Sequence, residues 1–391
     1  MERAGLYIHI PFCLRKCAYC DFVSYAGCED AIEPYISALL AEMDAVHRRF
    51  PGLAVPTVYV GGGTPSCLPP GRIARVLKRA RERFDIAPDA EITVETNPET
   101  ADGAKMEEFA RAGVNRLSLG LQSANGRILQ AIGRLHGAED FVRAAELARR
   151  SGIVNIGADV MYGLPGQTVR DHLDALETAA DAGAVHASTY ALTLAEGTPL
   201  CAAVAKGAIR LPDEDAQYEM YCAGDEFLEA RGFMRYEVSN YAKPGFACRH
   251  NLVYWRNRPY VGLGAAAHSC VETNDGVFRV ENVSGLDEYV ARAIRGASPA
   301  AAHARIGREE SMFETMMLGL RLTDGVDLSA FLERYGADAK AVYAEPIARL
   351  TASEMIRMEK GRLIPTRKGL DFHNRMALEF LENELDKDVL R

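Results

Sequence analysis

The chain has 391 residues, 48% of them hydrophobic and 25% charged, which predicts a globular protein with one large domain and a smaller one. Its formal net charge of −9 argues against nucleic acid as a partner, although it leaves room for a local basic patch. No apolar run approaches the length of a membrane span, and the short apolar stretch near the start has no cleavage site, so the sequence predicts a cytoplasmic protein.

Six strands are expected in the first half of the chain, with amphipathic helices between them. This alternation predicts an α/β fold with a parallel sheet, either doubly wound or closed as a barrel, and periodicity alone does not choose between the two. In either fold, ligands bind at the carboxyl ends of the strands. The expected strands are residues 6–10, 57–61, 91–95, 116–120, 153–160 and 186–192, and the expected helices are 31–50, 70–84, 104–112, 138–150 and 169–182.

After about residue 299 the pattern becomes mostly helical. It predicts helices at 309–321, 328–335, 346–358 and 366–384, with a short hairpin near 360–365. We therefore expect a barrel domain over 1–300 and a helical, winged-helix-like domain over 301–391. No basic recognition face is evident in the second domain, which favours a structural lid over DNA binding.

Three cysteines stand within eight residues, directly after the first expected strand: Cys13, Cys17 and Cys20. In a cytoplasmic chain such a cluster indicates metal binding rather than disulfides. Thiolates hold iron–sulfur clusters, and three local ligands leave one corner of a [4Fe-4S] cluster open, as in a reactive metal site. A zinc site completed by Cys28 or His9 is the alternative, but the spacing does not match known zinc motifs.

A CxxxCxxC motif after a strand, with aromatic Tyr19 before the last cysteine, resembles the radical S-adenosylmethionine (SAM) superfamily. The resemblance implies a partial (β/α)6 barrel. It also implies that SAM chelates the open iron through its amino and carboxylate groups, and that an electron from the cluster then generates a 5′-deoxyadenosyl radical. By the same resemblance, Tyr7 lies beside the cluster and Ala191 near the adenine.

A glycine-rich segment, Gly61, Gly62 and Gly63 followed by Thr64, comes after the second expected strand. Glycines let the backbone approach a ligand closely. A phosphate-binding loop is the competing interpretation, but the Lys-Ser/Thr pair of such a loop is absent. The resemblance assigns this segment to the methionyl amino group of SAM.

Polar residues also stand at the ends of the next three strands: Glu95, Gln122 and Asp159. A carboxylate there can accept hydrogen bonds from ribose hydroxyls or an amine, and Arg134 can pair with the carboxylate of SAM. Any one of these residues alone would be read as a cap or a surface residue. Together they predict a ring of SAM-binding groups.

The order of these motifs is similar to that of the oxygen-independent coproporphyrinogen III oxidase family, which includes HemW-type heme chaperones. The oxidases carry a further cysteine two positions after the third one, where this chain has Phe22, and a longer segment before the cluster. Both departures count against coproporphyrinogen oxidation and match the chaperone type.

Residues 250–255 read HNLVYW and fit the HNxxYW motif that the chaperone type links to heme binding. His250 is the predicted axial ligand, since imidazole commonly ligates heme iron, and His268 and Cys248 are rival candidates. The flanking arginines 249, 256 and 258 could meet the heme propionates. The alternative is that the motif's aromatic residues are simply core residues.

Two functions follow from these features. The first is a heme chaperone that binds heme, holds a SAM-ligated [4Fe-4S] cluster and transfers heme to an unidentified acceptor protein. The second is a radical SAM enzyme acting on a tetrapyrrole, for example as an oxygen-independent coproporphyrinogen III dehydrogenase. The HNxxYW motif and Phe22 favour the heme chaperone. The SAM ring looks complete, so the sequence also permits SAM cleavage.

Overall fold

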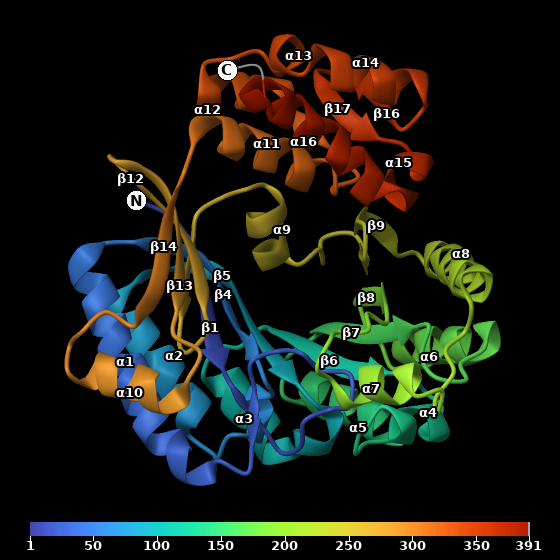
Figure 1. Cartoon of the computed structure of the whole chain (residues 1–391). Helices are drawn as coiled ribbons and strands as arrows, with labels where there is room; N and C mark the ends of the chain where they lie inside the picture. The colour runs from blue at the N-terminus through green and yellow to red at the C-terminus, as the bar shows by residue number, and fades with distance from the viewer. Residues whose placement is uncertain (390–391) are drawn as a thin grey trace.

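The computed structural model describes residues 1–389, and within them one sheet of twelve strands dominates the fold (Figure 1). Six neighbouring parallel strands lie in the sheet in the order in which they occur in the chain. A doubly wound sheet would reverse direction at a switch point, so this order confirms the predicted partial (β/α)6 barrel. The strands are β1 (Gly5–Ile10), β4 (Ala54–Gly62), β5 (Asp85–Thr96), β6 (Arg116–Gln122), β7 (Asn155–Tyr162) and β8 (His186–Ala191).

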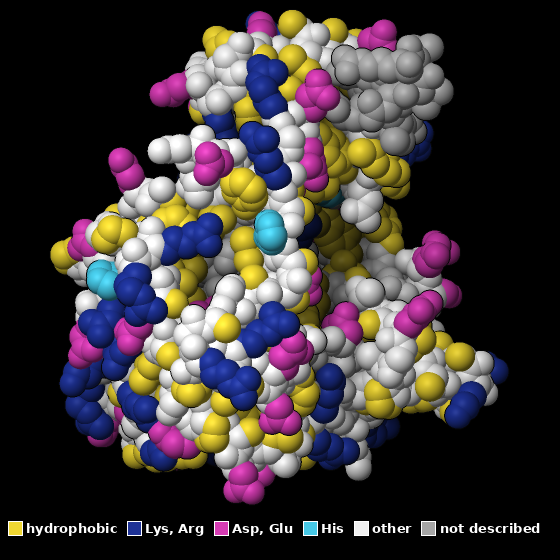
Figure 2. Space-filling view, turned by 60° about the vertical axis from the view of Figure 1, so that its left-hand side comes forward, with side chains coloured by type: hydrophobic (Ala, Val, Ile, Leu, Met, Phe, Trp, Pro, Cys, Tyr) yellow, Lys and Arg dark blue, Asp and Glu magenta, His cyan; other side chains and the backbone are white. Residues whose placement is uncertain are grey.

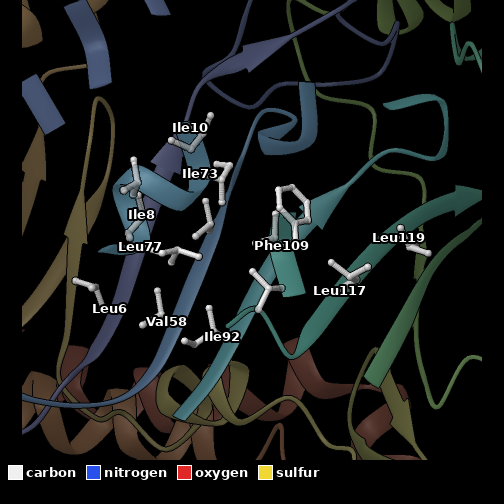
Figure 3. Packing of buried hydrophobic residues seen from close by; sticks show 14 of the residues in the cluster. Leu6, Ile8, Ile10, Val58, Ile73, Leu77, Ile92, Phe109, Leu117 and Leu119 are labelled. Carbon is white, nitrogen blue, oxygen red and sulfur yellow. The ribbon is translucent and has the colours of Figure 1, made fainter. Parts of the chain in front are cut away.

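Helices cover the outer face of this sheet, where its apolar side chains point. Figure 3 shows Ile8, Val58 and Leu117 packed with Leu77 and Phe109 of the covering helices. Since side chains alternate along a strand, the residues between them point into the barrel, and these are largely polar or aromatic. The covering helices are α1 (Ile32–Arg49), α2 (Arg72–Arg83), α3 (Gly103–Arg111), α5 (Ala138–Arg150) and α6 (Val169–Asp181).

The sheet continues beyond the six predicted strands at both edges. β11 (Tyr260–Leu263) pairs in parallel with β1, and β12 (His268–Thr273), β13 (Gly276–Asn282) and β14 (Ala300–Ile306) extend it as an antiparallel meander. At the other edge, β10 (Asn240–Ala242) pairs antiparallel with β8, and β9 (Met234–Glu237) with β10. The sequence pattern predicts none of these strands, since the expected strands end at residue 192.

The C-terminal part combines helices with a small sheet, as the hairpin prediction required. β16 (Ile356–Glu359) pairs with β17 (Arg362–Pro365), and β15 (Val326–Asp327) completes the sheet. The predicted helix at 346–358 is wrong at its end, because α14 stops at Ala352 and Glu354 takes a left-handed conformation with φ of 58° before β16. The remaining helices are α11 (Arg308–Gly319), α12 (Leu328–Tyr335), α13 (Ala339–Val342), α14 (Ala344–Ala352), α15 (Arg367–Asp371) and α16 (His373–Val389).

Two separate hydrophobic clusters underlie these two parts. One runs from Ala4 to Ala293, and the other from Met312 to Phe380. The predicted division at residue 300 stays a prediction, because β14 crosses it while pairing with the large sheet. None of the helices in the described part of the chain is long and apolar enough to cross a membrane.

A buried carboxyl group, Glu42 on α1, joins several segments at the edge of the barrel. It accepts hydrogen bonds from the Gly264 N–H at 2.8 Å, the Asn282 amide at 2.7 Å and the Tyr289 hydroxyl at 2.6 Å. Burial raises the pKa of Glu42 to about 7, although these three donors oppose the shift.

This shift predicts that stability falls as the pH rises from about 4.5 to 7. In that window the unfolded chain releases the Glu42 proton while the folded chain keeps it, so ionisation favours unfolding by about 3 kcal/mol in total. We expect the stability of the native protein relative to Glu42→Gln to drop by about 2–3 kcal/mol between pH 5 and pH 8. Denaturant unfolding of both proteins at the two pH values measures this, and a pH-independent difference would contradict it.

Candidate functional site

The three cysteines lie at the carboxyl end of the first barrel strand. Cys13 ends the short strand β2 (Phe12–Cys13), and Cys17 and Cys20 follow in the next loop. The loop is fixed by the Ala18 N–H, which donates to the Ile132 carbonyl at 3.0 Å. All three thiols are half-buried and line one cavity.

The thiols do not converge on a single point. Among the side chains that the structure describes, no three of His, Cys, Asp or Glu come together as ligands of one metal ion. In a [4Fe-4S] cluster each thiolate binds a different iron, so a spread trio fits a cluster better than zinc. His9 is committed elsewhere, because its ring nitrogens bond the Tyr7 hydroxyl at 2.9 Å and the Val23 carbonyl at 3.0 Å.

Hydrogen-bond donors surround two of the sulfurs. The Thr64 hydroxyl donates to Cys13 Sγ and Arg134 Nη1 donates to Cys17 Sγ, each at 3.5 Å. Burial raises the pKa of the Cys13 and Cys20 thiols, and the Arg134 charge and the Thr64 bond oppose this at Cys13. A raised pKa disfavours the thiolate form, and a metal ion beside the sulfur acts in the opposite direction.

A cavity of about 450 Å³ opens beside these sulfurs and brings most of the predicted ring together. Its volume lies in the usual range for a small-molecule site. Tyr7, Gly61 and His250 do not line it, whereas eleven other predicted residues do. They are Cys13, Cys17, Cys20, Gly62, Gly63, Thr64, Glu95, Gln122, Arg134, Asp159 and Ala191.

The Glu95 carboxylate leaves no room for a side chain at Gly61 in the glycine-rich segment. A Cβ on Gly61 would stand 2.7 Å from the Glu95 carboxyl carbon, and Gly62 has a φ of +112°, which side chains rarely tolerate. Glu95 accepts from the Gly62 N–H and from the Tyr59 hydroxyl, both at 2.9 Å. Burial raises the pKa of Glu95 to about 7, and these donors oppose the shift.

Asp159 faces the cavity from β7. It accepts from the Ser118 hydroxyl at 3.0 Å, and burial raises its pKa against the pull of hydrogen bonds and of Arg116. Two carboxyl groups, Glu95 and Asp159, thus stand in the same cavity as acceptors.

Two polar groups in the cavity have atoms without partners. Arg134 donates Nη2 to the Asn97 side-chain oxygen at 3.0 Å and to the Gly120 carbonyl at 3.2 Å, but its buried Nε has no partner among the described residues. Gln122 has a φ of 56°, and its buried Oε1 likewise finds no partner in the described part of the chain. Buried polar atoms are normally satisfied, so these two point to a polar ligand.

The HNxxYW segment lies elsewhere. It forms α9 (Arg249–Trp255), near the N-terminal ends of the strands, and its His250 is 1% exposed. His250 hydrogen-bonds Thr57 Oγ1 at 2.9 Å and the Tyr254 hydroxyl at 2.8 Å, so both ring nitrogens are engaged. Cys248 is fully buried, while His268 is exposed.

Several residues in or near the site were missed from the sequence. Asn97 bonds both Thr64 and Arg134. It stands two positions after Glu95, so the rule that polar residues at strand ends bind ligands could have identified it. Arg116 is 1% exposed inside the barrel, and a charged residue opening an otherwise buried strand was the available signal. Tyr190 lines the cavity, but nothing in the pattern marked it.

Comparison with known proteins agrees with this geometry. Residues 7–179 match the family model of the radical SAM superfamily, and residues 306–372 that of the HemN C-terminal domain. The chain is 36% identical to heme chaperone HemW of Mycobacterium tuberculosis (strain ATCC 25618 / H37Rv) over 92% of both chains. It is 34% identical to heme chaperone HemW of Bacillus subtilis (strain 168) over 96% of this chain and 98% of the relative.

A solved structure supports the fold. Coproporphyrinogen III oxidase (HemN) from Escherichia coli, described as a radical SAM enzyme, superposes with a TM-score of 0.84 over 97% of this chain and 90% of the other. The two sequences are 22% identical, so this likeness concerns the fold alone.

Proposed function

Because this chain belongs to the radical SAM superfamily and, within it, to the HemW family, we propose that it is a heme chaperone that binds heme and passes it to an acceptor protein. The observation that carries the proposal is the similarity of almost the whole chain to proteins named heme chaperone HemW. The HNLVYW segment and the exposed Phe22, where the oxidases have a fourth cysteine, agree with it.

The proposal includes a [4Fe-4S] cluster on Cys13, Cys17 and Cys20, with SAM in the cavity beside it. The unpartnered Arg134 Nε and Gln122 Oε1 support a polar ligand there. A SAM-ligated cluster supplies one-electron chemistry at the sulfonium of SAM. The residues of the chain bind and orient SAM. Arg134 offers its guanidinium to the carboxylate, while Glu95 and Asp159 accept hydrogen bonds from the amine or the hydroxyls.

Heme titration tests the chaperone proposal. Ferric hemin added to the cluster-loaded protein should give a saturable Soret band with a dissociation constant in or below the micromolar range. Heme-loaded protein mixed with an apo-hemoprotein should then transfer the band to the acceptor. Absence of saturable hemin binding would reject the proposal.

The same preparation tests the tetrapyrrole-enzyme alternative. Under anaerobic conditions with a reductant, SAM and coproporphyrinogen III, we expect no protoporphyrinogen IX to form. Production of protoporphyrinogen IX at many turnovers would favour the dehydrogenase instead. Cleavage of SAM without that product would leave the chaperone proposal intact.

A further inference from the structure

A second large cleft lies by the N-terminal ends of the strands, away from the cysteines. It has a volume of about 930 Å³, within the range of ligand pockets. Its walls are formed by residues 1–5, residues 56 and 57 of β4, one face of α9, the loop after α9 and the turn between β12 and β13. Figure 1 shows the N-terminus beside β12, and Figure 2 brings this side forward with Lys and Arg among hydrophobic side chains.

The helix α9 presents different residues to the barrel and to this cleft. Leu252 and Val253 line the cleft, together with the arginines at 249 and 256. Positions i, i+3, i+4 and i+7 share one helix face, so these four residues form a single surface. His250 and Tyr254 lie on another face and point into the barrel, where the His250 ring stacks on Tyr59 with ring centroids 5.2 Å apart.

The interior position makes His250 a poor iron ligand. Burial, helped by the nearby charge of Arg116, lowers the pKa of His250 to about 3. A heme iron could reach the ring only by breaking its bonds to Thr57 and Tyr254 and displacing Tyr59. The bonding of His250 therefore fixes α9 against β4 and leaves the outer face of the helix as the accessible part of the motif.

The cleft is rich in arginine although the chain as a whole is acidic. Four arginines line it, against two glutamates, Glu2 and Glu272. Arg249 donates to the Asp89 carbonyl at 2.6 Å, and Arg256 lies 3.7 Å from the Asp324 carboxylate. The other two, Arg3 and Arg258, are exposed, and their side chains make no hydrogen bond or ion pair within the described part of the chain.

Resting on the proposed function, we propose that this cleft is the heme site and that it holds the tetrapyrrole by its two carboxylates. Arg3 and Arg258 are the carboxylate partners, since guanidinium pairs bidentately with carboxylate. Leu252 and Val253 offer apolar contact to the macrocycle. The residues that line the cleft include no His or Cys, and Met1 is the only thioether among them, so the proposed recognition rests on the carboxylates rather than on the iron.

Three porphyrins and one double variant test this assignment. The only tryptophan, Trp255, lies on α9, so quenching of its fluorescence reports binding of porphyrins with or without iron. The probes are ferric hemin, metal-free protoporphyrin IX and its dimethyl ester. For the native protein we expect hemin and protoporphyrin IX to bind within about 3-fold of each other, and the ester at least about 10-fold more weakly.

The double variant Arg3→Gln/Arg258→Gln should lose at least about 10-fold in affinity for hemin and protoporphyrin IX, with little further loss for the ester. Arg111→Gln is the matched control, because Arg111 is 71% exposed on α3 and pairs with Glu107 alone among the described residues. Circular dichroism and melting temperature establish that each variant is folded.

The outcomes distinguish failure of the cleft assignment from failure of the heme-chaperone proposal. The cleft assignment would be overturned if hemin bound saturably with the same affinity to the native protein and the double variant. It would also be overturned if protoporphyrin IX and its dimethyl ester bound with equal affinity. In both cases the chaperone proposal would still stand. A strong preference for hemin over protoporphyrin IX would point to an iron ligand and would also overturn the cleft assignment. If hemin does not bind the native protein at all, both proposals fail.

Discussion

Replacement of Cys17 by serine should abolish the iron–sulfur cluster. Cys17 is one of only three proposed ligands, and a serine hydroxyl is a poor substitute for a thiolate on iron. It also receives the hydrogen bond from Arg134 Nη1, which links the cluster loop to the opposite wall of the cavity. After anaerobic reconstitution, we expect iron to fall from about four atoms per chain to below one, with loss of the broad visible absorbance.

Cys28→Ser is the control for this experiment. Cys28 is half-buried in the same N-terminal region, its thiol bonds the Ala26 carbonyl, and it does not line the cavity. It was also a candidate fourth ligand for zinc. Full iron and sulfide in Cys17→Ser, or equal loss in both variants, would mean that the cluster has other ligands.

The alternation of strands and helices and its ligand-binding end could be predicted because both follow from local rules. The choice of a barrel over a doubly wound sheet came from the resemblance to the radical SAM superfamily. Outward positions of the six parallel strands are apolar. Glu95 and Gln122 stand at the ends of β5 and β6, Asp159 lies three residues before the end of β7, and chain topology gathers the three at one cavity. No knowledge of distant pairing was needed for the alternation or for the ligand-binding end.

The outer strands and the orientation of α9 could not be predicted, for a different reason. β11 owes its place to pairing with β1, some 250 residues earlier in the chain, and its four residues carry little pattern of their own. The HNxxYW motif marks α9 but does not say which face of that helix is buried. His250 is satisfied by Thr57 and Tyr254, and the burial of a single side chain depends on tertiary packing that a motif does not encode.

The second large effect is expected from Arg134→Gln, which should weaken SAM binding by about 10- to 100-fold. Arg134 is anchored by Asn97 and the Gly120 carbonyl, so its guanidinium is held in the cavity before any ligand arrives. A hydrogen bond to a charged group contributes about 1.5–3 kcal/mol, and glutamine keeps neither the charge nor the forked donors. Calorimetric titration of SAM into reconstituted protein measures the loss.

The control variants must separate this effect from damage to the cluster, because Arg134 also touches Cys17. Arg127→Gln removes an exposed arginine from the nearby helix α4 (Gly126–Ala131) and should leave SAM affinity unchanged. Arg134→Lys keeps the charge without the fork, so its affinity should lie between those of the native protein and the glutamine variant. If Arg134→Gln retains about four irons per chain and binds SAM as tightly as the native protein, Arg134 does not contact SAM. Retained iron with lost SAM affinity would place its guanidinium on the SAM carboxylate, since the cluster loop would then be intact while the charged contact is gone.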